Sequence, residues 1–448
     1  MHIHLIGIGG IGMSALARYF HAKGVQVSGS DIEESDLTRE LAVLGVTVHT
    51  GSHAAPHIPP HTDLVIYNPA ISRENPELRE ARNRGITVQS YARALSPITA
   101  TYRTIAVAGS HGKSTTTALT ALALEDGHLD PTVLIGTKLH EYGNTNFRLG
   151  QSRYLVLEAD EYGKKFLQYR PFAVVLTNVD VEHLDTFKTV AGIEDAFSRF
   201  LARVPAEGII VANKDDKRSR RVARSLGKRI TWYTLDHPDA NVVQRALAIP
   251  GKHNVSNALA ALYLARALGV RDSDTLYAFT RFKGSWRRFE FLGLYRGAYV
   301  ISDYGHHPRE VAATIEAARE RFPLRRVWCV FQPHHYDRLF TLWDAFVTAF
   351  DHADRVVLLP VYEVPGREKS APMKRRRMNA ETLARALEAR GKSAAYVASF
   401  SDASRLLAAE LHAGDVVLAV GAGDIHTDAV RLVSIPNTEG LAEAIDDI

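Results

Sequence analysis

Short apolar runs alternate with longer amphipathic segments along most of the chain, and this alternation predicts parallel strands joined by helices. Runs with the length of a buried strand cover residues 3–6, 25–27, 46–48, 64–66, 86–88, 104–108, 154–158, 172–176, 208–212, 299–303, 327–331, 355–359 and 416–420. Segments with helical periodicity cover residues 13–23, 37–44, 75–84, 113–125, 192–200, 258–268, 309–321, 339–350 and 380–390. The predicted fold class is therefore α/β, with doubly wound sheets.

The length of 448 residues suits about three domains. Residues 96–103 are expected to connect the first domain to the second, and the strand pattern restarts again near residue 292. We expect an N-terminal Rossmann-like domain at 1–100, a central domain at 101–291 and a C-terminal Rossmann-like domain at 292–448.

Residues 104–125 predict a strand, a small-residue loop and a helix, and they carry the strongest chemical signal in the chain. Gly109 and Gly112 allow the backbone to turn and to present N–H groups to a polyphosphate, at the positive end of the helix that starts near Lys113. Lys113 would reach the terminal phosphates, and the Ser114 hydroxyl would hold Mg²⁺. The alternative is a strand, a turn and a helix with incidental glycines. The loop predicts that the central domain is P-loop ATPase-like.

A second glycine-rich loop, with the pattern Gly-x-Gly-x-x-Gly at Gly7, Gly9 and Gly12, follows the first predicted strand. Asp31 ends the second strand, where a ribose-binding acid is expected. Taken alone, the pattern favours a dinucleotide. The pyrophosphate of a nucleotide sugar needs the same close approach to the backbone, so both ligands stay open.

Polar side chains follow the next two strands of the central domain. Glu158 is the best candidate for a Mg²⁺ carboxylate, with Asp160 and Glu161 nearby, and a solvated acidic strand end is the alternative. His183 could ligate a second metal ion or orient a phosphate, although a lone histidine is more often structural.

Two asparagines mark the start of the helix predicted near residue 258. Asn254 and Asn257 are three residues apart, so their amides share one face and could pair with the edge of a purine. Helix capping by Asn254 is the alternative.

Two histidine-rich loops, at residues 303–308 and 332–338, follow predicted strands of the C-terminal domain. Adjacent histidines point in divergent directions and imitate zinc-ligand spacing only weakly, so contact with substrate or phosphate is expected. The basic run at residues 374–377 is predicted to be a mobile loop, with specific binding of nucleic acid as the less favoured alternative.

The amino-acid composition mainly serves to exclude classes of function. With 46% apolar and 23% charged residues each domain can bury a core, and a net charge of +4 gives no reason to expect nucleic acid as a partner. The single cysteine, Cys329, excludes an intrachain disulfide and is predicted to be a buried strand thiol. Without a basic leader or an apolar stretch near ~18 residues, we expect no membrane association and a cytoplasmic protein.

Together these motifs resemble those of the Mur ligase family, which uses ATP to join an amine to a carboxylate. The resemblance spans all three predicted domains, and its carriers are residues 7–14, 28–31, 109–117, 158–161, 182–185, 253–257, 287–290, 302–308, 331–334 and 421–424. It implies that UDP-N-acetylmuramate binds the first domain, ATP and Mg²⁺ the central one, and L-alanine or a related amino acid the last. A monomer or a weak homodimer is expected.

The resemblance also implies residue roles. Those expected to be catalytic are Lys113, Glu158, His183, Arg288 and Asp303, with Ser114, Glu158 and His183 as metal ligands. Those expected at ATP are Gly109, Ser110, His111, Gly112, Lys113, Ser114, Thr115, Asn254, Asn257 and Arg288. Those expected at the other substrates are Gly9, Gly10, Ile11, Gly12, Ser30, Asp31, His306, His307, His334 and Arg338.

The chain departs from the family pattern at several places. Ser110 and Ser114 stand where the family usually has threonine, which keeps the hydroxyl. Residues 162–163 are Tyr-Gly instead of Ser-Asp, and residues 334–338 read His-His-Tyr-Asp-Arg instead of His-Arg-Tyr-Thr-Arg, so the choice of amino acid stays open. Asp195, twelve residues past His183, falls about where several members have a carbamylated lysine. It would supply that negative charge, or it is a surface acid favoured by the helix dipole.

The expected reaction is transfer of the γ-phosphoryl group of ATP to the lactyl carboxylate of UDP-N-acetylmuramate, followed by attack of the amine on the acyl phosphate. One alternative is a ligase that adds a preformed tripeptide to the same sugar. A nicotinamide-dependent oxidoreductase would leave Lys113 and Glu158 unexplained. A non-catalytic protein that binds the UDP-sugar is the remaining alternative.

Overall fold

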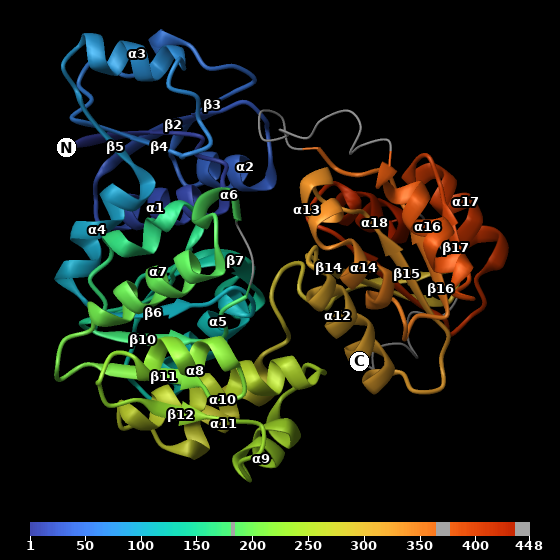
Figure 1. Ribbon diagram of the computed structural model, residues 1–448. Coiled ribbons are helices and arrows are strands. Elements are labelled where there is room, and N and C mark those ends of the chain that lie inside the picture. The colour runs from blue at the N-terminus through green and yellow to red at the C-terminus, as the bar shows by residue number, and fades with distance from the viewer. Residues whose placement is uncertain (181–183, 364–376, 435–448) are drawn as a thin grey trace. The chain divides into compact units, whose positions relative to one another are not determined.

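The computed structural model describes residues 1–180, 184–363 and 377–434 (Figure 1). His183 and residues 374–376 of the basic run lie outside the described residues. Contacts divide the chain into a first unit, residues 1–248 and 255–283, and a second unit, residues 249–254 and 284–448.

The first unit begins with a five-stranded parallel sheet in the order β3-β2-β1-β4-β5. Its strands are β1 His2–Ile6, β2 Gln26–Asp31, β3 Thr47–Thr50, β4 Leu64–Tyr67 and β5 Thr87–Ser90. Its helices are α1 Ile11–Ala22, α2 Asp36–Val43, η1 Ala55–His57, α3 Pro76–Asn83 and α4 Tyr91–Thr101. The strand order reverses beside β1, and ligands bind at such switch points in open α/β sheets. The loop of Gly7, Gly9 and Gly12 lies there.

The same unit contains a seven-stranded sheet in the order β12-β11-β10-β6-β9-β7-β8, in which β8 is antiparallel. Its strands are β6 Arg103–Ala108, β7 Thr132–Leu139, β8 Thr145–Arg148, β9 Tyr154–Glu158, β10 Ala173–Leu176, β11 Ile209–Asn213 and β12 Thr231–Tyr233. Its helices are α5 Lys113–Asp126, η2 His140–Tyr142, η3 Tyr162–Gln168, α6 Leu184–Phe187, α7 Val190–Ala202, α8 Lys217–Arg224, α9 Asp239–Ala246, α10 Lys252–Ala267 and α11 Asp272–Arg281. β6 pairs with β9 on one side and β10 on the other, so the loop after β6 lies at the switch point.

The second unit is built on a six-stranded sheet in the order β13-β14-β18-β15-β16-β17, in which β13 is antiparallel. Its strands are β13 Glu290–Tyr295, β14 Ala298–Asp303, β15 Val327–Phe331, β16 Arg355–Leu358, β17 Ala394–Tyr396 and β18 Val416–Val420. Its helices are α12 Pro308–Arg321, α13 Tyr336–Thr341, α14 Trp343–Ala349, α16 Ala380–Ala389, α17 Phe400–Glu410 and α18 Ile425–Val433. Cys329 is fully buried in β15, as predicted.

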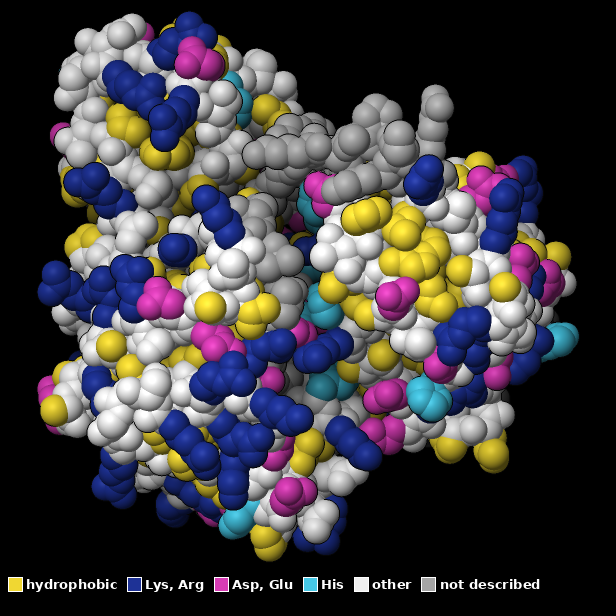
Figure 2. All heavy atoms as spheres, viewed as in Figure 1, with side chains coloured by type: hydrophobic (Ala, Val, Ile, Leu, Met, Phe, Trp, Pro, Cys, Tyr) yellow, Lys and Arg dark blue, Asp and Glu magenta, His cyan; other side chains and the backbone are white. Residues whose placement is uncertain are grey.

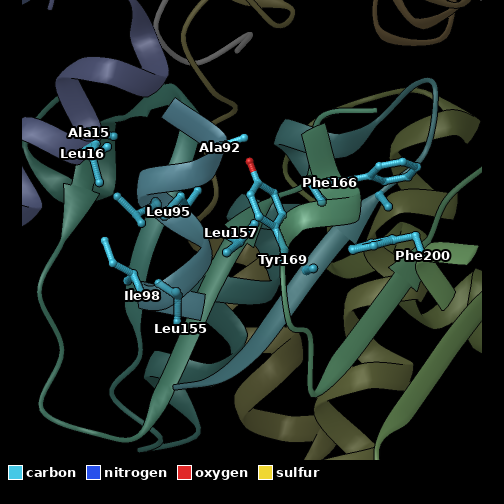
Figure 3. Close-up of a cluster of buried hydrophobic side chains, with 14 of the residues drawn as sticks. Ala15, Leu16, Ala92, Leu95, Ile98, Leu155, Leu157, Phe166, Tyr169 and Phe200 are labelled. Atoms are coloured by element: carbon cyan, nitrogen blue, oxygen red, sulfur yellow. The ribbon is translucent and has the colours of Figure 1, made fainter. Parts of the chain in front are cut away.

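One hydrophobic cluster extends across both sheets of the first unit. Figure 3 shows Leu95 and Ile98 of α4 beside Leu155 and Leu157 of β9, with Phe166 farther along the cluster. The ring of Phe166 stacks on the ring of Phe200 with centroids 4.6 Å apart. The N-terminal sheet is thus joined to the central sheet through α4.

The α/β fold class is confirmed, and several details differ from expectation. The strands β7, β8, β12, β13 and β17 were not predicted, and two of them, β8 and β13, are antiparallel. Residues 96–101, expected as part of a connection, form the second half of α4, which accommodates Pro97. The helix predicted at 339–350 is two helices, with Leu342 between them. The helix predicted from 258 begins at Lys252, so Asn254 lies inside its first turn. Among the described residues, no helix is long and apolar enough to cross a membrane.

Candidate active site

The loop between β6 and α5 is held by the residues that follow β10. The backbone N–H of His111 donates to Asn178 Oδ1 at 2.9 Å, and the N–H of Ser110 donates to the Asn178 carbonyl at 3.1 Å. Thr177 Oγ1 donates to the His111 carbonyl at 2.7 Å. Thr177 and Asn178, which follow β10, therefore fix the shape of the loop.

Gly109 and Gly112 are required at their positions. Their φ values of +144° and +78° lie in the left-handed region. A β-carbon at Gly109 would lie 2.0 Å from Thr177 Oγ1, and one at Gly112 would lie 2.3 Å from Asn257 Oδ1. Asn257 of α10 is thus packed against the phosphate loop, a neighbourhood that agrees with its predicted place near the nucleotide.

The Lys113 ammonium lies inside the loop. It donates to the carbonyls of Gly109 at 2.6 Å and Ser110 at 2.9 Å, and it lies 3.0 Å from Glu161 Oε2. Glu161 is 2% exposed, so this ion pair is shielded from solvent. A phosphate in the loop would offer the ammonium a second anionic partner.

Ser114 and Glu158 meet at the carboxyl ends of β6 and β9. Ser114 Oγ donates to Glu158 Oε2 at 2.9 Å, and the N–H of Gly136 donates to the same oxygen at 3.2 Å. A hydroxyl and a carboxylate at this spacing are hard oxygen ligands of the kind that Mg²⁺ prefers. The residues present therefore fit a magnesium ion beside the phosphate loop.

Ser110, His111 and Thr115 complete the loop predicted from sequence. Ser110 Oγ accepts the N–H of Asp180 at 2.8 Å, and His111 Nε2 lies 3.4 Å from Asp180 Oδ2. Thr115, one residue beyond Ser114, is buried. Asp180 was not singled out in the sequence, because only the fold brings the end of β10 to this loop.

Arg218 also approaches Asp180, with Nη1 3.6 Å from Oδ1, and its Nε lies 3.9 Å from Glu194. It belongs to α8, over which Lys and Arg side chains gather in Figure 2. Asp195, by contrast, is 62% exposed and pairs with Arg199 along α7. The exposure of Asp195 favours the interpretation as a surface acid.

The glycine-rich loop after β1 is braced by the end of β2. The Ser30 carbonyl accepts the N–H groups of Gly7 at 2.8 Å and Ile8 at 3.0 Å. Asp31 Oδ2 accepts the N–H of Gly9 at 2.8 Å. The sequence placed Asp31 at a ribose, but here its carboxylate shapes the loop itself. Gly10, Ile11 and Gly12 lead from this loop into α1.

Asn146 of β8 binds the first turn of α1, a contact that sequence reasoning missed. Its side-chain nitrogen donates to the Ile11 carbonyl at 2.7 Å and to Ser14 Oγ at 2.8 Å. Lys138 of β7 adds an ion pair of 2.7 Å with Glu40 of α2. These contacts join the glycine-rich loop to the central sheet within the first unit.

The helix α10 carries both asparagines predicted near adenine. Because α10 begins at Lys252, Asn254 lies inside the helix and not at its N-cap position, and its Nδ2 donates to the Pro250 carbonyl at 2.6 Å. The capping alternative is therefore wrong, and a role in purine recognition stays a prediction.

In the second unit, Asp303 ends β14 and is 8% exposed. It accepts the N–H groups of Phe289 at 2.9 Å and Gly305 at 2.7 Å. Burial raises the pKa of Asp303, although Arg288 and the two N–H donors favour the carboxylate. Arg288 also lies 3.9 Å from Glu310, so these residues form one charged cluster.

The two histidine-rich loops approach each other within the second unit. The rings of His306 and His334 are 5.7 Å apart, and the ring of His334 stacks on Tyr362. Arg338 Nη1 lies 3.1 Å from His334 Nδ1. Because arginine only donates, His334 Nδ1 accepts, and a nitrogen that faces a guanidinium is a poor metal ligand. His334 Nδ1 is therefore not available to a metal ion.

His307 has a structural task in the same unit. It precedes α12 as the N-cap residue, and its Nδ1 accepts the N–H of Arg309. Glu310 closes the capping box by accepting the N–H of His307 at 3.2 Å.

Comparison with known proteins decides the family. The chain matches the models "Mur ligase family, catalytic domain" at residues 2–103, "Mur ligase middle domain" at 107–265 and "Mur ligase, glutamate ligase domain" at 287–423. It is 40% identical, over 97% of both chains, to UDP-N-acetylmuramate–L-alanine ligase of Alkaliphilus metalliredigens. The chain belongs to the Mur ligase family. The protein of the same name from Pelotomaculum thermopropionicum is 38% identical over 96% of this chain and 97% of its own.

Solved structures agree. The UDP-N-acetylmuramate–alanine ligase MurC of Thermotoga maritima superposes with a TM-score of 0.80 at 29% identity, over 97% of this chain and 98% of its own. A murein peptide ligase of Psychrobacter arcticus shares the fold, with a TM-score of 0.70 at 24% identity over 98% of this chain and all of its own. The two glycine-rich loops lie within matched parts of the family: Gly7, Gly9 and Gly12 within residues 2–103, and Gly109 and Gly112 within residues 107–265.

The packing of Asn257 against Gly112 leads to a testable prediction. Gly112→Ala should weaken ATP binding at least tenfold, because its β-carbon would displace Asn257 and the loop together. Titration calorimetry with a non-hydrolysable ATP analogue measures this.

Gly143→Ala is the matched control, since Gly143 also has a positive φ, +69°, but nothing within 4 Å of the added atom. It should cost only about 1 kcal/mol of stability and leave binding intact. Equal affinities of parent and Gly112→Ala would contradict the prediction.

Proposed function

We propose that this Mur ligase uses ATP to join L-alanine to the lactyl carboxylate of UDP-N-acetylmuramate, in the synthesis of peptidoglycan precursors. The observation that carries the proposal is the full-length similarity to relatives named UDP-N-acetylmuramate–L-alanine ligase, together with an intact phosphate loop. We assign the UDP-sugar to residues 1–100, ATP to 101–291 and the amino acid to 292–448. We place the reaction in the cytoplasm, where nucleotide substrates are available, with the protein a monomer or a weak homodimer.

Phosphoryl transfer needs positioning and charge compensation more than covalent chemistry from the protein. The loop of Gly109 to Gly112 supplies N–H groups and the positive end of α5 to the phosphates. Lys113, now paired with Glu161, would compensate the charge that builds up on the transferred group. Attack of the amine on the resulting acyl phosphate then forms the amide and releases phosphate.

Ser114 and Glu158 would hold Mg²⁺, which when bound neutralises charge on the phosphates. Arg288 and Asp303 of the second unit are proposed on the ATP side of the reaction, and Asn254 and Asn257 at adenine. His183, which lies outside the described residues, stays a predicted second metal ligand.

The amine is proposed to bind the loops of His306, His307, His334 and Arg338. A guanidinium can hold the carboxylate of an amino acid with two hydrogen bonds and leave the amine free. Arg338 is half-buried, and its guanidinium donates to His334, so this contact orients the guanidinium within the loop.

The function is tested by phosphate release from ATP with UDP-N-acetylmuramate and each of L-alanine, other amino acids and a tripeptide. We expect turnover with L-alanine, and loss of turnover in Lys113→Ala by at least a hundredfold with UDP-sugar binding retained. Turnover with the tripeptide alone would identify the tripeptide-adding activity instead. Oxidation of NAD(P)H without phosphate release would overturn the proposal.

Glu158→Gln tests the magnesium site. An amide keeps the shape of the carboxylate but loses its charge, so turnover should fall and recover partly at raised Mg²⁺. The apparent Mg²⁺ affinity is measured from initial rates. A Mg²⁺ dependence equal to that of the parent would count against this ligand.

Arg338→Ala tests the amine site. We expect the KM for the amino acid to rise about tenfold or more while the KM for ATP stays within about twofold, because only the carboxylate contact is lost. A defect confined to ATP binding would contradict this assignment. Arg321→Ala, in the last turn of α12, is the control outside these loops.

A further inference from the structure

A buried polar network lies between the N-terminal sheet and α3. Its centre is Glu77, which is fully buried in the first turn of α3. Its partners come from β1, β2 and the segment after β3, and all are buried or half-buried. Three of these partners are His4, His53 and His57, and the proposed chemistry uses none of them.

The carboxylate of Glu77 is surrounded by side-chain hydrogen-bond partners. Oε2 accepts from Ser30 Oγ at 2.7 Å and from His4 Nε2 at 3.0 Å. Oε1 accepts from His53 Nδ1 at 3.1 Å. His57 Nδ1 lies 3.2 Å from Oε1, but it accepts the N–H of Ala54 at 3.3 Å, so it is a neighbour and not a donor. An ionised carboxylate only accepts, so His4 Nε2 and His53 Nδ1 each carry a hydrogen.

The network continues along β1. His4 Nδ1 lies 2.9 Å from Ser28 Oγ, which lies 3.0 Å from His2 Nε2. Burial alone would raise the pKa of Glu77, but hydrogen bonds from His4, Ser30 and His53 outweigh it and lower the pKa to about 2. Glu77 is therefore ionised at neutral pH, a costly state that persists only while its donors stay in place.

Ser30 connects this network to the glycine-rich loop. Its side chain donates to Glu77, whereas its carbonyl accepts the N–H groups of Gly7 and Ile8. The next residue, Asp31, holds the N–H of Gly9. A displacement of Ser30 would therefore move three consecutive N–H groups of the loop.

We propose that Glu77 is a positioning residue for the nucleotide sugar: by fixing Ser30 it holds the glycine-rich loop in the shape that receives the phosphates. The proposal rests on the assignment of the UDP-sugar to this domain. Glu77 touches no substrate in this account and acts only through Ser30 and its histidine donors.

Glu77→Gln tests it, because the amide keeps the size of the side chain but offers two donors where the network needs acceptors. The Kd and the KM for UDP-N-acetylmuramate should rise about tenfold, while kcat and the KM values for ATP and L-alanine stay within about twofold. Glu80→Gln, on the same helix and outside the network, should behave as the parent does.

Ser30→Ala and the double variant complete a double-mutant cycle. Both changes interrupt the same connection, which runs from Glu77 through Ser30 to the glycine-rich loop. Their effects on the Kd should therefore be less than additive. If Glu77→Gln does not fold, His53→Ala, which removes a donor to Glu77 and has no assigned role at a substrate, must still raise the Kd and spare kcat. Parent-like Kd in a folded Glu77→Gln, or additive effects in the cycle, would overturn the proposal. Absence of UDP-sugar binding in the parent would instead refute the proposed function.

The pH dependence of unfolding gives a second readout. A carboxylate with a folded pKa near 2 and an unfolded value of about 4.3 stabilises the fold above pH ~4.3, and this stabilisation is lost as the pH falls towards 2. The acid-induced loss of stability should be smaller in Glu77→Gln than in Glu80→Gln. Equal slopes would contradict an ionised Glu77.

Discussion

The structure depends on side chains packing so close to the phosphate loop that no β-carbon fits between them. At Gly109 and Gly112, Thr177 after β10 and Asn257 of α10 occupy the space that a side chain would need. This contact fixes the loop between β6 and α5, and with it the positions of Lys113 and Ser114. Catalysis by positioning requires a loop whose shape is fixed in this way.

The first unit contains two such glycine-rich loops, and different groups hold each of them in place. The phosphate loop is held by the side chains of Thr177 and Asn178 and by Lys113, which pairs with the buried Glu161. The glycine-rich loop after β1 is held by Ser30 and Asp31, and through Ser30 it depends on the buried charge of Glu77. Each loop thus depends on a buried carboxylate, which needs its donors in place. Glu161 acts through a lysine of the loop itself, whereas Glu77 acts through Ser30, which lies outside its loop.

Local pattern accounts for the features that could be predicted from the sequence. The α/β class, most strand positions and the residues of both glycine-rich loops could be predicted, because apolar runs and glycines act over a few residues. The strands β7, β8, β12, β13 and β17 were missed. Asn146, Asp180 and Glu77 were not legible, because each acts on a loop more than 40 positions away in the chain. Asn254 was misplaced for a local reason: α10 begins six residues earlier than its apolar pattern suggested.

Specificity for the amine has a different physical basis from the phosphate sites. The phosphate loops use backbone N–H groups, which any sequence with glycines in the right places can supply. The predicted amine site uses side chains, where His334 accepts from Arg338 and stacks on Tyr362. Exchanging one such side chain changes the size and polarity of the site without disturbing β14 or β15. On the proposed assignment of the amine to these loops, the residues at 335 and 337 would alter the choice of amine while β14 and β15 keep their positions in the sheet.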